Sequence, residues 1–246
     1  SNVIFFIHSN MNDTLWIGTK DGGFSEFDMK KNTFTNYLFN AGDSSSISNN
    51  VVLYIHNSND GNLWLATEKG LNKFNRKTKK FKVYTEDNGL PDNKIYAVLE
   101  DDNRVLWLSS DKGLCKFNPA IPLTDNKAIR TFDVNDGLQG NEFTQGGYYK
   151  DNASGELFFG GTNGFNIFNP ENITENPHKP EVFITSFKIF DKEVKLDTAV
   201  SFKKHIELSY KQNFLSFEFV GLDYLNPSKN LFQYKMEGLD MNWSVP

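Results

Sequence analysis

The chain has 246 residues, of which 38% are hydrophobic and 15% aromatic, and its formal net charge is −5 at pH 7. This acidic balance argues against a nucleic-acid surface in this segment, because phosphate contacts need clustered Lys and Arg. No apolar run approaches the length of a membrane span, and residues 1–7 lack the basic start and long apolar stretch of a signal peptide. We therefore expect that a targeting segment has been removed or that the sequence begins inside a longer protein.

A hairpin recurs along the first 170 or so residues. It is clearest at residues 61–75, where an apolar run around Trp64 leads into a charged turn ending at Gly70 and then into a second run ending at Phe74. Two short runs joined by a turn containing glycine are typical of antiparallel strands. Aligned on the aromatic residue, the copies centre on Trp16, Trp64, Trp107 and Phe158.

Each hairpin is flanked by further predicted strands. They precede the four hairpins at 3–8, 51–56, 95–100 and 143–149, and follow the first three at 34–39, 81–85 and 129–134. Four strands in a unit of roughly 45 residues match a β-propeller blade, and no helical periodicity extends over a useful length. We predict four blades in residues 1–172, the last lacking its outer strand, as part of a larger ring.

The remaining residues show a different sequence pattern. Residues 173–180 are rich in proline and are predicted to form a linker. Beyond it, apolar residues occupy alternate positions at 206–210, 215–219 and 232–236, a pattern typical of sheets with one buried face. We predict a truncated immunoglobulin-like β-sandwich at 181–246, and hence an all-β chain.

These features resemble a known family. The repeats, as in residues 60–67, 70–71 and 88–93, look like the two-component regulator propeller repeat. Residues 234–243, Tyr-Lys-Met-Glu-Gly-Leu-Asp-Met-Asn-Trp, resemble the tyrosine-rich sandwich domain (Y_Y_Y) that follows such propellers. The combination is similar to the periplasmic sensor region of hybrid two-component systems of Bacteroides-type bacteria, and it covers nearly the whole chain.

The resemblance implies a function. In that family, propellers and sandwich precede a membrane helix, a histidine kinase, a receiver and a DNA-binding domain, and the sensor responds to polysaccharide breakdown products. We expect a periplasmic, non-enzymatic sensing fragment with an oligosaccharide ligand and a homodimeric parent, which meets the membrane only through a downstream helix. The sequence departs from the family in holding about four blades and no kinase. The alternatives are a propeller-type polysaccharide lyase or glycosidase, and a scaffold whose loops contact a partner protein.

The histidines give little support for chemistry of the chain's own. His8 and His56 each stand eight residues before the tryptophan of their repeat, and Glu100 and Lys150 close the corresponding strands. A position that recurs in neighbouring blades favours a role at a strand end over metal ligation. No catalytic motif is present, so we expect no catalytic residue, no metal and no cofactor.

The repeated residues are interpreted as structural. Burying an aromatic side chain removes about 150 to 250 Å² from water, which contributes about 4 to 6 kcal/mol as an upper estimate. We therefore expect the repeat core to consist of Trp16, Trp64, Trp107 and Phe158 with Gly70, Gly113 and Gly164.

The loops that lead into the innermost strands, 41–50, 86–94 and 135–142, are the predicted place for a ligand. Asn49, Asn93 and Asn141 align there, as expected of turn-forming amides. The next position differs between repeats, which is what a ligand would exploit, although a water-filled polar channel predicts the same residue types. The candidate ligand-binding residues are Asn50, Lys94, Glu142, Gln145, Tyr148 and Tyr149.

An open ring also leaves the edge of its last blade unpaired, and such edges are normally covered. We therefore expect the chain to dimerise or exchange strands through that edge.

Overall fold

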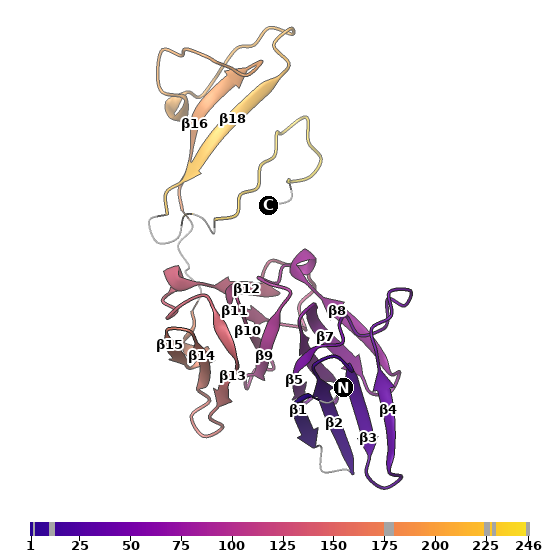
Figure 1. The fold of residues 1–246 in the computed structure, drawn as a ribbon. Coiled ribbons are helices and arrows are strands. Elements are labelled where there is room, and N and C mark those ends of the chain that lie inside the picture. The colour runs from indigo at the N-terminus through magenta and orange to yellow at the C-terminus, as the bar shows by residue number, and fades with distance from the viewer. Residues whose placement is uncertain (2, 10–12, 175–179, 224–226, 228–229, 245–246) are drawn as a thin grey trace. The chain divides into compact units, whose positions relative to one another are not determined.

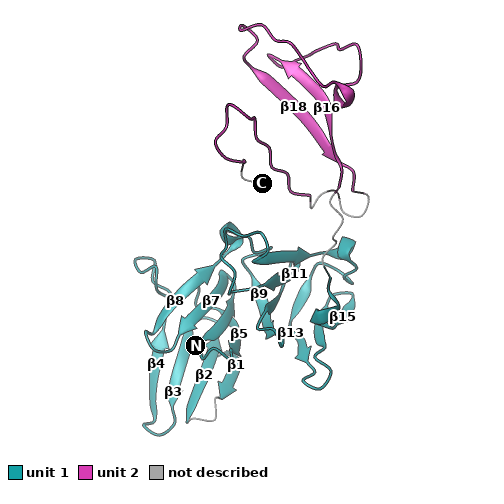
Figure 2. Cartoon of the chain, turned by 180° about the vertical axis from the view of Figure 1, so that it is seen from behind, with its two compact units in different colours: residues 1–174 teal, residues 175–246 magenta. Residues whose placement is uncertain are grey.

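The computed structural model describes residues 1, 3–9, 13–174, 180–223, 227 and 230–244, and it is built from short antiparallel sheets (Figure 1). The helices in these parts of the chain are short 3-10 turns, and none has the length and apolar character needed to cross a membrane. The chain divides into two compact units, residues 1–174 and 175–246 (Figure 2). The predicted all-β fold is confirmed.

The first unit contains four blade-like sheets, in each of which consecutive strands are neighbours. Their strands are β1 (Ile4–Ser9), β2 (Thr14–Thr19), β3 (Phe24–Asp28) and β4 (Thr33–Tyr37); β5 (Val52–Asn57), β6 (Leu63–Thr67), β7 (Gly70–Asn75) and β8 (Lys80–Tyr84); β9 (Ile95–Glu100), β10 (Leu106–Ser110), β11 (Gly113–Phe117) and β12 (Ile129–Phe132); and β13 (Phe143–Lys150), β14 (Leu157–Gly161) and β15 (Gly164–Phe168). The fourth sheet has three strands among the described residues, one fewer than the others.

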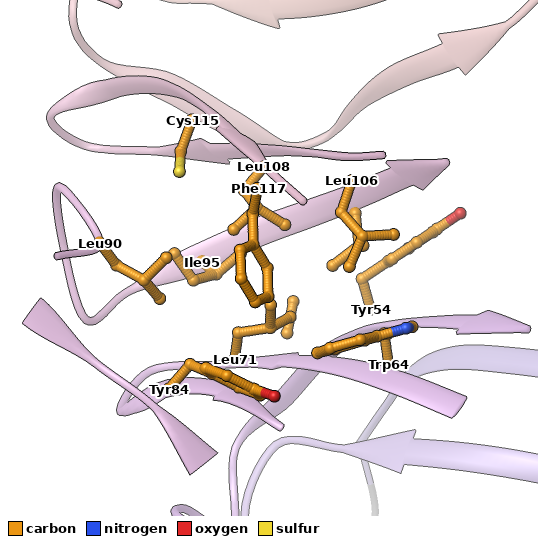
Figure 3. Close-up of a cluster of buried hydrophobic side chains, with 12 residues drawn as sticks. Tyr54, Trp64, Leu71, Tyr84, Leu90, Ile95, Leu106, Leu108, Cys115 and Phe117 are labelled. Carbon is orange, nitrogen blue, oxygen red and sulfur yellow. The ribbon is translucent and has the colours of Figure 1, made fainter. Parts of the chain in front are cut away.

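The sheets pack face to face through three hydrophobic clusters. Trp64 and Leu71 of the second sheet meet Leu108 and Phe117 of the third in the cluster of Figure 3. Side chains alternate along a strand, so each sheet has a preceding face, toward the sheet before it in sequence, and a following face, toward the sheet after it. The same arrangement joins the first sheet to the second and the third to the fourth. Cys115, the single cysteine, is buried in the cluster of Figure 3, and burial raises the pKa of its thiol.

The aromatic residues of the repeat do not all lie in this core. Trp16, Trp64 and Trp107 are buried on the following faces of their sheets. Phe158 departs from the expectation, because it is only half-buried and its neighbour Phe159 is the buried ring. The reason is that Phe158 lies on the following face of the fourth sheet, which no sheet of the described residues covers.

The glycines of the repeat fit the expected structural role. Gly70 and Gly113 have φ of +109° and +108°, a region that favours glycine, and close the turns before β7 and β11. A Cβ at Gly113 would lie 2.1 Å from the carbonyl oxygen of Phe132 on the outer strand. Gly164 has φ +116°, but nothing lies within 4 Å of the Cβ position, in keeping with the missing outer strand.

The second unit has one small sheet, in the order β17-β16-β18, with β16 (Val182–Ile189), β17 (Lys192–Glu193) and β18 (Leu215–Gly221). The alternating segment at 215–219 lies within β18, but the strands predicted at 206–210 and 232–236 are not formed. The alternating pattern reports which side chains prefer burial, whereas a strand also needs a neighbour for its backbone hydrogen bonds. Of the predicted linker, residues 175–179 lie outside the described residues.

Candidate ligand-binding site

Three of the candidate residues lie at one end of the innermost strands. Strands β1, β5, β9 and β13 are neighbours in the first unit (Figure 1). Because the sheets repeat one topology, the loops that enter these strands gather at the same end, which we call the loop end. Asn50, Lys94 and Glu142 each stand one or two residues before β5, β9 or β13.

Asn50 has a structural task, which corrects its assignment as a ligand-binding candidate. Its side-chain oxygen accepts a hydrogen bond from the backbone of Phe39 at 2.8 Å, and its carbonyl accepts one from Gly23 at 2.9 Å. Asn93 does the same with Glu86 and Gly70. Asn141 does so with Val134 and Gly113.

The equivalent of Asn93 is therefore Asn50 and not Asn49. Distance to the tryptophan would have shown this, because Asn50 and Asn93 both stand 14 residues before it (64 − 50 and 107 − 93). The position that differs between repeats is Val51, Lys94 and Glu142. An apolar, a cationic and an anionic residue thus occupy it in successive sheets.

Lys94 belongs to a polar cluster that sequence reasoning did not find. Its Nζ lies 3.6 Å from Oδ2 of Asp111 and 4.8 Å from the ring centre of Tyr96. The Tyr96 hydroxyl donates to Oδ1 of Asp111 at 2.7 Å. A hydrogen bond with Tyr96 raises the pKa of Lys94, and the charges of Asp111 and Glu68 add to it. Asp111 could have been anticipated, because the β10–β11 turn begins where Ser110 pairs with Ile95 at the start of β9.

The other candidates are spread over different surfaces. Glu142 and Gln145 are exposed at the loop end. Tyr148 is half-buried, and burial raises the pKa of its hydroxyl. Tyr149 is 61% exposed beside Phe158, on the following face of the fourth sheet. The structure therefore separates Tyr149 from the loop end.

Aromatic rings fill the space between the innermost strands below the loop end. The ring of Tyr54 lies 4.5 Å from that of Phe6 and 4.5 Å from that of Tyr148, in edge-to-face contacts. Tyr54 is buried, and burial raises the pKa of its hydroxyl. These three rings, the aromatic floor, contradict a polar channel at this level.

The loop end thus offers a cation, carboxylates and a phenol hydroxyl above an aromatic floor. Lys94 and Asp111 keep 37% and 42% of their side-chain surface exposed. Such a surface can exchange hydrogen bonds with a ligand rich in hydroxyl groups. Within the described residues, no group of three or more His, Cys, Asp or Glu side chains is arranged to hold a metal ion.

Comparison with known proteins agrees with this architecture. The family model "Two component regulator propeller" matches residues 46–69 and 89–112. The chain is 32% identical over 176 residues to Histidine kinase P4 of Formosa agariphila, a match that covers 67% of this chain and 12% of that protein.

Among solved structures, the chain resembles the extracellular domain of the hybrid two component system BT3049 from B. thetaiotaomicron. The TM-score is 0.72 at 28% identity, over 99% of this chain and 32% of that one. The chain therefore spans about a third of the solved domain it matches and a smaller share of the curated relative. Residues 46–69 and 89–112 thus match the two-component regulator propeller repeat, and the fold along nearly the whole chain is similar to that of an extracellular domain of a hybrid two-component system.

Proposed function

We propose that the chain is a sensing part of an extracytoplasmic region, which responds to oligosaccharides from polysaccharide breakdown and signals to a histidine kinase further along the parent protein. The observation that carries this proposal is the likeness in fold, along nearly the whole chain, to an extracellular domain of a hybrid two-component system. The chain has no catalytic role in this proposal. The kinase performs the chemistry, and the repeats supply the binding surface.

The proposed organisation follows the sequence pattern. Residues 1–172 form the propeller repeats, 173–180 the linker and 181–246 a sandwich of the tyrosine-rich type. The region is periplasmic and meets the membrane through a downstream helix of the parent. No nucleic acid binds this segment, whose net charge is −5.

The proposed ligand surface is the loop end, with Lys94, Asp111 and Tyr96 at its centre and Glu142 beside them. Lys94 donates hydrogen bonds, Asp111 accepts them, and both side chains reach solvent. A neutral saccharide can satisfy both without the desolvation cost of burying an unpaired charge. Gln145 adds an exposed amide that can both donate and accept.

Calorimetry with a panel of oligosaccharides on the complete sensor region of the parent tests this assignment. We expect one saccharide class to bind, and we expect Lys94→Met to weaken it about tenfold or more, the range for a lost charged hydrogen bond. Lys77→Met is the matched control, since Lys77 is exposed on the β7–β8 turn. Absence of binding across a broad panel would count against saccharide sensing. Saccharide turnover that is abolished by Glu142→Gln would favour a lyase or glycosidase.

We also propose that subunits associate through the fourth sheet. Its last strand, β15, has no neighbour on its outer side among the described residues. Tyr149 and Phe165 on its following face are 61% and 64% exposed. The three internal interfaces cover the equivalent faces of the other sheets, so this face is suited to a partner surface of the same kind.

A further inference from the structure

The innermost strands carry charged residues at the end opposite the loop end. His56 pairs with Trp64 across β5 and β6, so it lies on the following face of the second sheet. Glu100 pairs with Leu106 across β9 and β10, so it lies on the preceding face of the third sheet. The two side chains meet between the sheets, with Nε2 of His56 2.7 Å from Oε2 of Glu100. Their exposed fractions are 19% and 4%, so the pair is largely shielded from water.

We call this contact between two innermost strands, at the end opposite the loop end, a joint. The equivalent joints at the other two interfaces have different chemistry. Between the first and second sheets it consists of His8 and Asn57, and the Asn57 oxygen accepts a hydrogen bond from Nη2 of Arg76 at 2.9 Å. Between the third and fourth sheets it consists of Leu99 and Lys150. Of the three joints, the middle one alone pairs an imidazole with a carboxylate.

The charges around the middle joint come from several elements. Burial acts to raise the pKa of Glu100, but hydrogen bonds from His56 and Ser58 outweigh it and hold that pKa below its ordinary value, while the charge of Asp60 acts to raise it. Nζ of Lys150 donates to the Glu100 carbonyl at 2.9 Å and to Asp102 at 2.7 Å. The Glu100 carboxylate therefore has one potentially cationic partner, His56, while Lys150 holds the Glu100 backbone and Asp102 beside it.

At the first joint, between the first and second sheets, the charges that act on the histidine are positive. Burial, then the charges of His56 and Arg76, lower the pKa of His8 below its ordinary value of 6.5. Nε2 of His8 makes no hydrogen bond within the described part of the chain. The cationic groups that act on His8 are thus His56 and Arg76, and Asn57 supplies no charge. The carboxylate of this interface, Glu26, faces Arg76, whose pKa its charge acts to raise.

We propose that His56 is a proton-sensitive clasp, whose protonation tightens the joint between the second and third sheets and loosens the joint between the first and second. A neutral imidazole shares a hydrogen bond with Glu100, whereas an imidazolium adds a charge pair in a site of low water access. The same added charge acts on His8, where it opposes a second positive charge.

The two joints determine how the stability of each interface changes with pH. Glu100, with its lowered pKa, remains a carboxylate through the range in which imidazoles titrate. His8 has a lowered folded-state pKa, so the stability present above pH 6.5 is lost as the pH falls toward that lower pKa. Mild acidification therefore weakens the first interface while the second gains a charge pair.

Hydrogen exchange of the 246-residue chain at about pH 7.5 and about pH 5.5, corrected for the intrinsic pH dependence of exchange, tests the clasp across the titration range of histidine. We expect protection in β1 and β2 to fall several-fold at the lower pH while protection in β9 and β10 holds or rises. His56→Gln, which keeps a side chain able to form hydrogen bonds but cannot take up a proton, should abolish the gain at β9 and β10 and reduce the loss at β1 and β2.

His205→Gln is the matched control. The His205 side chain is 81% exposed in the second unit, so this variant should leave the pH response of hydrogen exchange unchanged. Glu100→Gln provides a second variant, which should abolish the gain even if His56→Gln fails to fold. The same pH response in wild type, His56→Gln and Glu100→Gln would overturn the proposal, as would a wild-type chain whose two interfaces respond alike.

Discussion

The three tryptophans of the repeat share their burial, but Trp107 and Trp16 differ in what their indole N–H groups bind. Trp107 donates to Oδ2 of Asp101 at 3.0 Å, while backbone groups of Asn103 and Val105 occupy the other oxygen. Trp16 is as well buried, but its Nε1 makes no hydrogen bond to the residues that the structure describes. Tryptophan at this position therefore contributes packing in both the first and the third sheet, and a side-chain hydrogen bond in the third sheet.

This difference predicts unequal costs for the same substitution. Trp107→Phe leaves the buried Oδ2 of Asp101 without its donor, so it should cost about 1 to 3 kcal/mol more than the loss of packing alone. Trp16→Phe removes a comparable ring and no such bond. Urea unfolding followed by circular dichroism measures both variants, and equal losses would show that the indole bond contributes nothing.

Residue roles at the loop end could be predicted only in part from the sequence. Repeat alignment predicts the positions of Lys94 and Glu142 at the loop end, but it shifts Asn50 by one position because a second asparagine, Asn49, precedes it. Tyr96 and Asp111 join Lys94 through side-chain contacts across a sheet. Hairpin register places Asp111 near the start of β9, but no spacing in the sequence encodes the side-chain contacts themselves.

At the scale of elements, the hairpin turns show how the outer strand fixes the requirement for glycine. Gly113 and Gly164 close equivalent turns with similar positive φ. Only Gly113 faces an outer strand, where the carbonyl of Phe132 occupies the space a Cβ would need.

Alanine at the two turns should separate backbone strain from steric clash. Gly164→Ala should cost about 1 to 2 kcal/mol for its left-handed backbone. Gly113→Ala should cost about 1 to 3 kcal/mol more, because β12 must also move. Calorimetric melting of both variants gives the comparison. A larger loss for Gly164→Ala would contradict the role assigned to the outer strand.

Elements were predictable from the sequence where a local pattern also had a partner strand. The Trp-Gly-Phe hairpins carry both of their strands within about 15 residues, and all four formed. Residues 206–210 and 232–236 alternate as clearly, but neither segment is a strand or has a partner strand among the described residues, whereas residues 215–219 pair with β16.

For the first unit as a whole, the decisive property is that two outward faces of its sheet stack are not covered by another sheet of the described residues in that unit. Ile7 and Phe34 of the first sheet are 54% and 60% exposed, as Phe165 of the fourth sheet is 64% exposed. Contacts between unlike faces of this kind are heterologous, and they generate rings or open chains of subunits.

Association should therefore depend on concentration and on the fourth sheet. Sedimentation velocity of the chain is expected to show dimers or larger species, and Phe165→Glu should shift them toward monomer by placing a charge in the contact. Phe202→Glu, at a 78% exposed position in the second unit, is the control. A monomer at all concentrations would refute the proposed association.

The aromatic floor has a mechanical consequence. Tyr54 touches rings from the first and the fourth sheets, which share no backbone pairing. A displacement of Tyr148 at one blade must be accommodated by Tyr54 and then by Phe6, because close-packed rings cannot interpenetrate. Tyr54 thus connects the first and fourth sheets through ring contacts, a route between them that does not pass through the third sheet.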